Sequence, residues 1–118
     1  MPSLRFDELD VDGVHVLVLE GELEVSTVGS VQRELIAAVE THGCVAMDGM
    51  GLTFIDSSGM RLLLSALRIV GRNSGCLVFA CANPTVLRLF AVTGMDGTFE
   101  MTTSRDEAVS RAREQLAA

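Results

Sequence analysis

The densest group of polar side chains in this sequence is the run Asp56-Ser57-Ser58-Gly59, which follows an apolar pair. Aspartate and serine cap the N-termini of helices, because their side chains accept hydrogen bonds from free backbone N–H groups. One helix needs one cap, whereas this run offers three capping residues and then a glycine that weakens a first helical turn. The spacing alone leaves two interpretations open: a simple cap, or a functional site built on a helix start.

A serine at a helix start is suited to carry a phosphate group. The free N–H groups and the helix dipole both favour negative charge at this position. Phosphorylation there need not disrupt the domain itself, so its effect would fall mainly on a partner docked at that surface. In this interpretation Gly59 keeps the approach to the Ser57 and Ser58 hydroxyls open.

The elements that must position this run follow from apolar periodicity, caps and turn residues. The patterns predict, in chain order, strand 4–7, strand 14–19, helix 27–42, strand 44–47, helix 57–72, strand 76–81, helix 84–93, edge strand 98–101 and helix 105–118. The first two strands form a hairpin across Asp12-Gly13, and alternation after them implies parallel crossovers. We therefore expect one α/β domain over residues 1–118, with a mixed sheet of four to five strands and about four α-helices packed on it.

The charge balance excludes several classes of function. The chain has 16 acidic and 9 basic residues, a net charge of −7, and every basic residue is arginine. Binding to nucleic acid or to anionic lipid needs a positive surface. The start of the chain shows no apolar signal region, and the longest uncharged run, residues 73–87, is too short and too polar to span a bilayer. We expect a cytoplasmic protein that binds neither nucleic acid nor a membrane directly.

The cysteines and histidines form no metal-binding or catalytic pattern. Cys44, Cys76 and Cys81 lie in apolar runs without a C-x-x-C pair, as small hydrophobic residues in a reducing compartment would. His15 and His42 lie far apart in the sequence, and neither has a neighbouring ligand at metal-binding spacing, so structural roles are expected. No catalytic triad or lysine-bearing phosphate loop is present. We therefore expect no metal, no cofactor and no enzymatic activity.

Three segments carry a resemblance to a known family. They are Thr53-Phe54-Ile55-Asp56-Ser57-Ser58-Gly59-Met60, Glu20-Gly21-Glu22-Leu23-Glu24, and Asn83-Pro84-Thr85-Val86-Leu87-Arg88-Leu89-Phe90 followed by Thr93-Gly94-Met95. In this order they are similar to the signature, the Gly-Glu-Leu-Asp stretch and the late helix of the STAS family, the bacterial anti-sigma-factor antagonists. The resemblance covers almost the whole chain.

The resemblance implies roles for particular residues. Ser57, directly after the aspartate, would be phosphorylated by a partner anti-sigma factor that acts as a serine kinase. Asp56 would orient the site, and Ser58 would support the loop and contact the partner. Glu24 stands where the family has an aspartate in the partner interface. The run Asp48-Gly49-Met50-Gly51 departs from the family pattern, and its glycines imply a looser loop.

A row of polar residues follows Ser57 along the predicted helix. Arg61, Ser65, Arg68 and Arg72 occur at spacings of three and four, which places them on one helix face. This face is either an ordinary solvated surface or a contact for an acidic partner, which arginine can bind through paired hydrogen bonds. The candidate partner-binding residues are Glu24, Asp56, Ser57, Ser58, Gly59, Arg61 and Arg68.

Together these features predict an anti-sigma factor antagonist. The unphosphorylated form would bind a serine-kinase anti-sigma factor and so release a sigma factor, and phosphorylation at Ser57 would switch binding off. A serine phosphatase would reset the switch, and the chain would be a monomer or weak dimer. The alternative is an unphosphorylated STAS scaffold subunit of a membrane transport (ABC-type) complex; the intact Asp56–Gly59 run and Glu24 favour the first.

Overall fold

The computed structural model describes residues 1–118. Five strands and four α-helices alternate in the predicted order, with one short 3-10 helix (η1). In chain order they are β1 Leu4–Val11, β2 Val14–Leu23, α1 Val28–Thr41, β3 Cys44–Ile55, α2 Ser57–Arg72, β4 Cys76–Ala80, α3 Pro84–Thr93, η1 Met95–Gly97, β5 Glu100–Thr102 and α4 Arg105–Ala117. The expected fold class, α/β with a mixed sheet, is confirmed.

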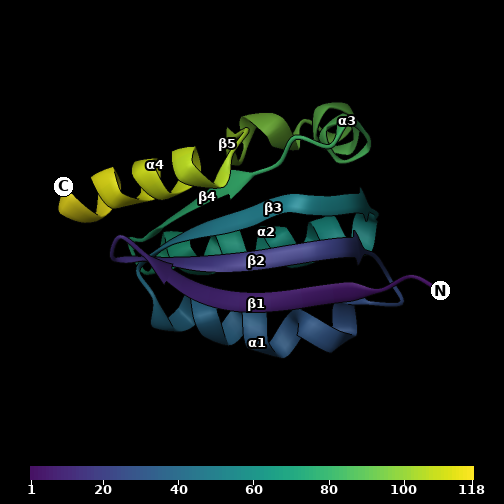
Figure 1. Ribbon diagram of the computed structural model, residues 1–118, viewed down its shortest axis with the longest axis horizontal. Coiled ribbons are helices and arrows are strands. Elements are labelled where there is room, and N and C mark those ends of the chain that lie inside the picture. Colours follow the sequence, from purple (N-terminus) through teal and green to yellow (C-terminus); the bar gives the residue numbers. More distant parts are fainter.

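The strands form one sheet in the order β1-β2-β3-β4-β5 (Figure 1). Strands β1 and β2 are antiparallel and the other neighbouring pairs are parallel. The hairpin turn holds Asp12 at φ 51° and Gly13 at φ 83°. Positive φ at both central residues suits the right-handed twist of a two-residue hairpin, so the turn predicted from Asp12-Gly13 is confirmed.

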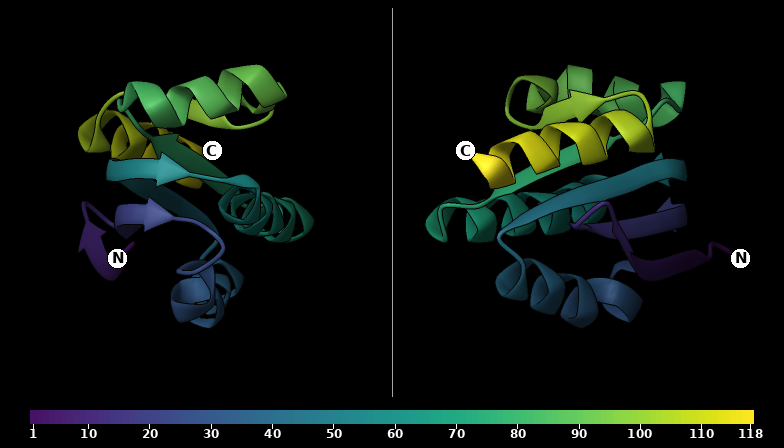
Figure 2. Two further views of the ribbon diagram at one scale, coloured as in Figure 1. Left: turned by 90° about the vertical axis from the view of Figure 1, so that its right-hand side faces the viewer. Right: turned by 60° about the vertical axis from the view of Figure 1, so that its left-hand side comes forward.

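Helices cover both faces of the sheet (Figure 2). Helices α1 and α2 pack on one face, where Leu17, Leu35 and Leu63 are fully buried in the larger of two apolar clusters. Helix α4 packs on the other face through Ala108, Val109 and Ala112. Burial on both faces explains why the middle strands are apolar almost throughout. No helix is both long and apolar enough to cross a membrane.

Strand β3 runs eight residues beyond its predicted end at Met47. Its second half pairs with the end of β2 through two register shifts. A Cβ atom at Gly49 would lie 2.8 Å from the Phe79 ring, and one at Gly51 would lie 2.8 Å from Cγ of Glu20. The prediction of a loose loop was wrong, because these glycines permit close approach within a strand.

The cysteines are buried, as their apolar surroundings predict. Cys44 and Cys76 are register partners on β3 and β4. Burial, and the neighbouring Cys44, raise the pKa of the Cys76 thiol to about 12. Burial also raises the pKa of Cys81. A thiol held protonated in this way is a poor nucleophile and a poor metal ligand.

The two histidines are not apart in space. The rings of His15, on β2, and His42, at the end of α1, stack with centroids 3.6 Å apart. Nε2 of His15 lies 2.7 Å from Oε1 of Glu8. Sequence spacing did not reveal this contact, because it is the crossover from β2 through α1 that brings the two histidines together.

Candidate functional site

The candidate site lies where β2 and β3 end and α2 begins, at one end of the sheet (Figure 1). Asp56 caps α2: its Oδ1 accepts hydrogen bonds from the backbone N–H groups of Ser58 (2.9 Å) and Gly59 (3.0 Å). Of the three residues offered by the sequence, Asp56 is therefore the cap. The two serines are left free for other roles.

The second oxygen of Asp56 reaches outside its own helix. Oδ2 accepts a hydrogen bond from the backbone N–H of Val25 at 3.0 Å. Val25 belongs to the loop between β2 and α1, so one carboxylate joins two segments that are 31 residues apart in the chain. The backbone N–H of Asp56 also donates to the carbonyl of Leu23 at 3.3 Å. The start of α2 is thus held against the end of β2.

Gly59 is needed for this contact. A Cβ atom at this position would lie 2.4 Å from the carbonyl oxygen of Leu23 and 2.9 Å from Cγ1 of Ile55. Real side chains do not approach backbone oxygens so closely, so only glycine lets the first turn of α2 sit here. Packing against β2 therefore explains Gly59, which a cap alone does not require. This role replaces the expectation that Gly59 keeps the approach to the serine hydroxyls open.

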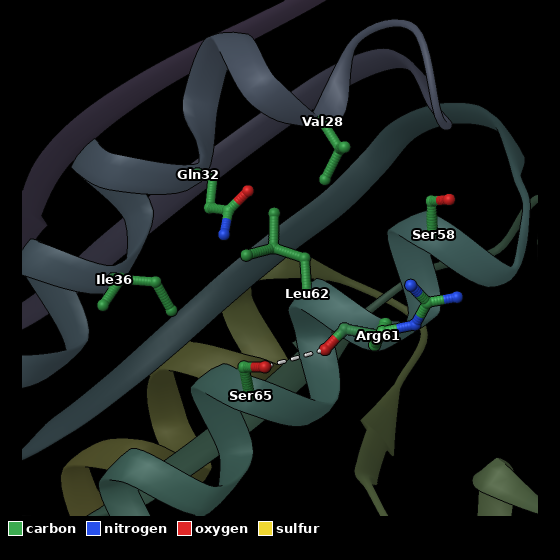
Figure 3. A pocket seen from close by; sticks show the side chains of 7 residues that line it. All are labelled: Val28, Gln32, Ile36, Ser58, Arg61, Leu62 and Ser65. Atoms are coloured by element: carbon green, nitrogen blue, oxygen red, sulfur yellow. Dashed lines mark hydrogen bonds between the residues drawn. The ribbon is translucent and has the colours of Figure 1, made fainter.

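The two serines have different surroundings. Ser57 is the first residue of α2 and is exposed, whereas Ser58 is half-buried. Neither hydroxyl has a hydrogen-bond partner within the protein. Ser58 lines a groove of about 380 Å³ between α1 and α2, together with Arg61, Leu62 and Ser65 of α2 and three residues of α1, Val28, Gln32 and Ile36 (Figure 3).

The loop that carries Glu24 has its own internal bonds. Glu24 Oε1 accepts hydrogen bonds from the backbone N–H of Ser26 at 3.0 Å and from its hydroxyl. The buried Thr27 hydroxyl donates to the carbonyl of Glu22 at 2.6 Å and accepts from the backbone N–H of Glu24 at 3.0 Å. Thr27 therefore orders the loop, and its side chain accepts no capping hydrogen bond from α1. Glu24 is half-buried beside the start of α2.

The arginine row behaves as the helical spacing predicts. Arg61, Arg68 and Arg72 are exposed on α2, and none has a carboxylate oxygen within 4.0 Å. Ser65 donates its hydroxyl to the carbonyl of Arg61 at 3.0 Å (Figure 3). Helix α2 contains no acidic residue, so its outer face is positive on a chain of net charge −7. Arg61 also borders the groove beside Ser58.

Two exposed apolar residues next to the site were not singled out from the sequence. Val25 is 70% exposed and Phe54 is 39% exposed. Val25 is the residue whose N–H binds Asp56, and Phe54 lies two residues ahead of Asp56 near the end of β3. In the sequence Val25 is flanked by Glu24 and Ser26, and an apolar residue between polar neighbours in a loop was the available signal.

The fold and this site define a known class of protein. The family model for the STAS domain matches residues 8–108, so the chain belongs to the STAS family. The Anti-sigma F factor antagonist of Lysinibacillus sphaericus is 29% identical over 100 residues, which cover 83% of this chain and 85% of that protein.

Solved structures of the same class share the fold. An anti-sigma factor antagonist from Mycobacterium paratuberculosis superposes with a TM-score of 0.85 at 24% identity, covering 93% of this chain and 94% of that one. The anti-sigma factor antagonist SpoIIAA in its unphosphorylated form gives 0.70 at 24% identity, with 92% and 98% covered. Bacillus SpoIIAA in its phosphorylated form gives 0.67 at 23%, with 92% and 97% covered. The fold also occurs outside the antagonists: a sulfate transporter family protein from Wolinella succinogenes superposes with a TM-score of 0.76 at 13% identity, covering 93% of this chain and 93% of that one.

Proposed function

We propose that this chain is an anti-sigma factor antagonist whose binding is switched off by phosphorylation of Ser57. The observation that carries the proposal is the exposed Ser57 hydroxyl, without an internal partner, on the first residue of a helix held rigidly by Asp56 and Gly59. The names of the relatives, and the phosphorylated form of SpoIIAA, support the same interpretation.

The local hydrogen bonds explain why a phosphate would act on a partner. The N–H groups of Ser58 and Gly59 already bind Asp56, so a phosphate on Ser57 cannot use them. Its charge of about −1.5 to −2 would then face solvent or a docked protein rather than being neutralised inside the domain. A packed interface would have to desolvate this charge or repel it, at a cost of about 3–4 kcal/mol, which weakens binding a few hundred-fold.

The surroundings of Ser57 suit a protein partner. Exposed Val25 and Phe54 supply apolar contact area next to the serine. Arg61 and Arg68 supply unpaired positive charge, so the partner surface is proposed to be acidic where it meets α2. Glu24 lies in the loop that Asp56 holds and is proposed to take the place of the family aspartate at this interface.

The proposed partner is an anti-sigma factor of the serine-kinase type, which binds the unphosphorylated chain and so releases its sigma factor. The same partner would transfer the γ-phosphoryl group of ATP to the Ser57 hydroxyl oxygen, which releases ADP and the hydroxyl proton. A serine phosphatase would reset the switch by hydrolysing the ester with water to serine and inorganic phosphate. The chain itself acts in this scheme as a non-enzymatic, cytoplasmic binding protein, as a monomer or weak dimer.

Binding measurements test the switch. Ser57→Ala is expected to bind the anti-sigma factor constitutively, and Ser57→Asp to bind at least about a hundredfold more weakly, by calorimetry. Thr85→Asp is the matched control. Thr85 is exposed at the start of α3, so this substitution adds the same charge to another helix N-terminus. Equal affinity of the two Ser57 variants would contradict the proposal.

Intact-mass analysis tests the modification itself. Incubation with ATP and the kinase-type partner is expected to add one phosphate to the wild type and to Ser58→Ala, and none to Ser57→Ala. A phosphate found on the Ser57→Ala variant would show that the modified residue is not Ser57.

The alternative, a scaffold subunit of an ABC-type transport complex, makes the opposite prediction. Such a subunit would co-purify with a transporter ATPase or permease and would carry no phosphate on Ser57. Co-purification with an ATP-binding anti-sigma factor instead supports the switch.

A further inference from the structure

The group formed by Glu8, His15, His42 and Asp10 lies at the other end of the sheet from Ser57, near the hairpin turn and the end of α1 (Figure 1). One ligand atom from each of Glu8, His15 and His42 lies within 4.8 Å of the other two. We propose that these three residues form a site for a divalent transition-metal ion of the Zn²⁺ class, with Asp10 orienting the His15 ring.

The types of ligand determine which ions fit. Two imidazoles and one carboxylate suit Zn²⁺, Co²⁺, Ni²⁺ or Cu²⁺, whereas Mg²⁺ and Ca²⁺ prefer oxygen ligands alone. Three protein ligands leave the fourth tetrahedral position to water. Ligand atoms around tetrahedral zinc lie about 3.4 Å apart. The longest separations, which do not exceed 4.8 Å, therefore need to shrink slightly, and the 2.7 Å between His15 Nε2 and Glu8 Oε1 needs to lengthen as the ion replaces that hydrogen bond.

The existing bonds of His15 already resemble those of a metal ligand. Its side chain is only 10% exposed, with Nε2 2.7 Å from Glu8 Oε1 and Nδ1 3.5 Å from Asp10 Oδ1. Metal-binding histidines commonly bind the ion through one ring nitrogen and a carboxylate through the other. An ion between Nε2 and Glu8 would leave Asp10 at Nδ1, in that orienting position.

His42 supplies the second imidazole by turning. Its ring is now stacked on His15 with an angle of 9° between the planes, and two parallel rings cannot both direct a lone pair at one ion. His42 follows the last residue of α1, and its half-buried side chain is in part open to solvent. Binding of the ion therefore requires the His42 side chain to rotate so that a ring nitrogen turns toward Glu8.

The electrostatic setting favours a cation. The carbonyl end of a helix carries partial negative charge, and α1 has no basic residue in its last turn to offset it. Glu8 and Asp10 add two carboxylates on a chain whose net charge is −7. A bound ion would join the β1–β2 hairpin to the end of α1. It would lie about 26 Å along β2 from Leu23, which contacts the start of α2.

The test uses untagged, chelator-treated protein, since a histidine tag binds the same ions. Calorimetry with Zn²⁺ is expected to give one ion per chain, and a hundredfold excess over Kd to raise the melting temperature by about 10 °C. Co²⁺ is expected to give the intense visible spectrum of a tetrahedral site without a thiolate charge-transfer band.

Substitutions test which residues bind the ion. His42→Ala and Glu8→Gln are expected to weaken Zn²⁺ binding about a hundredfold, and Asp10→Asn about tenfold. Asp7→Asn is the matched control, because Asp7 neighbours Glu8 on β1 but belongs to the opposite face of the sheet, and it should leave Kd unchanged. Thermal melting of each ion-free variant checks that it is folded. His42→Ala is the informative variant, because it removes an imidazole that is only half-buried.

Three results would overturn the proposal: no Zn²⁺ binding at millimolar concentration, a cobalt–thiolate band that assigns the ion to cysteine, or unchanged affinity in His42→Ala. Binding of the anti-sigma factor is expected to be the same with and without Zn²⁺, so this test and that of the Ser57 switch fail independently.

Discussion

Helices α2 and α3 begin with the same pattern of capping hydrogen bonds and differ in what surrounds the cap. Asp56 accepts hydrogen bonds from the second and third N–H groups of α2, and Asn83 does the same for α3. The first helical residue is Ser57 in α2 and Pro84 in α3. Only the α2 cap has a further partner, the N–H of Val25 in another loop.

This difference shows how a helix start becomes a binding surface. A cap alone satisfies backbone N–H groups and leaves the helix free to shift with its own loop. The contacts of Asp56 with Val25 and of Gly59 with Leu23 instead fix α2 relative to a second exposed segment. A partner can then recognise both segments at once, with the Ser57 hydroxyl beside them.

The largest expected effect comes from Gly59→Ala. The new methyl group would clash with the Leu23 carbonyl, so the free energy of unfolding should fall by about 2–3 kcal/mol despite better helix propensity. Gly71→Ala is the matched control in the same helix, because a Cβ there meets nothing within 4 Å, and it should gain up to about 1 kcal/mol. Urea unfolding of both variants measures the difference; equal stabilities would mean that α2 is not held against β2 by close packing.

The next effect separates the two caps. Asp56→Ala should cost about 2 kcal/mol, because it removes a cap and the bond to Val25, whereas Asn83→Ala should cost about 1 kcal/mol. Amide hydrogen exchange should report faster opening of the Val25 N–H only in Asp56→Ala. A similar loss of stability in both variants, with Val25 protected, would make the two helix starts equivalent.

The smallest effect concerns added charge. Thr85→Asp should raise the free energy of unfolding by about 0.5 kcal/mol through the helix dipole. Ser57→Asp should change it by no more than about 0.5 kcal/mol, because the Asp56 carboxylate next to it offsets the dipole. Thermal melting at low ionic strength compares the two. A loss above about 1 kcal/mol in Ser57→Asp would show that charge at this position disrupts the domain rather than the partner interface.

Local signals predicted most of the fold. The Asp12-Gly13 turn forms as expected, and α3 and α4 begin at the predicted residues 84 and 105, directly after the capping residues Asn83 and Ser104. Each of these features depends on residues a few positions apart. The second half of β3 was missed. In the sequence its glycines resemble loop residues. Glycine is needed there because the Phe79 ring and the Glu20 side chain, both on other strands, approach the backbone closely.

The sequence predicted which polar residues form the site, but not the contacts that hold them or the exposed apolar residues beside them. The run at Asp56, the serine at position 57 and the exposed arginines of α2 follow from residue type and helical spacing. The exposed Val25 and Phe54 were missed, because exposure depends on which neighbours fail to cover a residue.

The sequence by itself determined which elements form, their order, the helix caps and the family. These depend on local backbone hydrogen bonds and on the spacing of apolar residues over short stretches of the chain. The tertiary structure alone decided which of the three polar residues at α2 is the cap, why Gly59 is glycine, and that His15 meets His42 beside Glu8. Each of these depends on a contact between segments far apart in the chain, which a crossover brings together. For the Asp56–Gly59 run, this contact joins a helix start to the loop after β2, and the proposed switch at Ser57 acts on that joined surface.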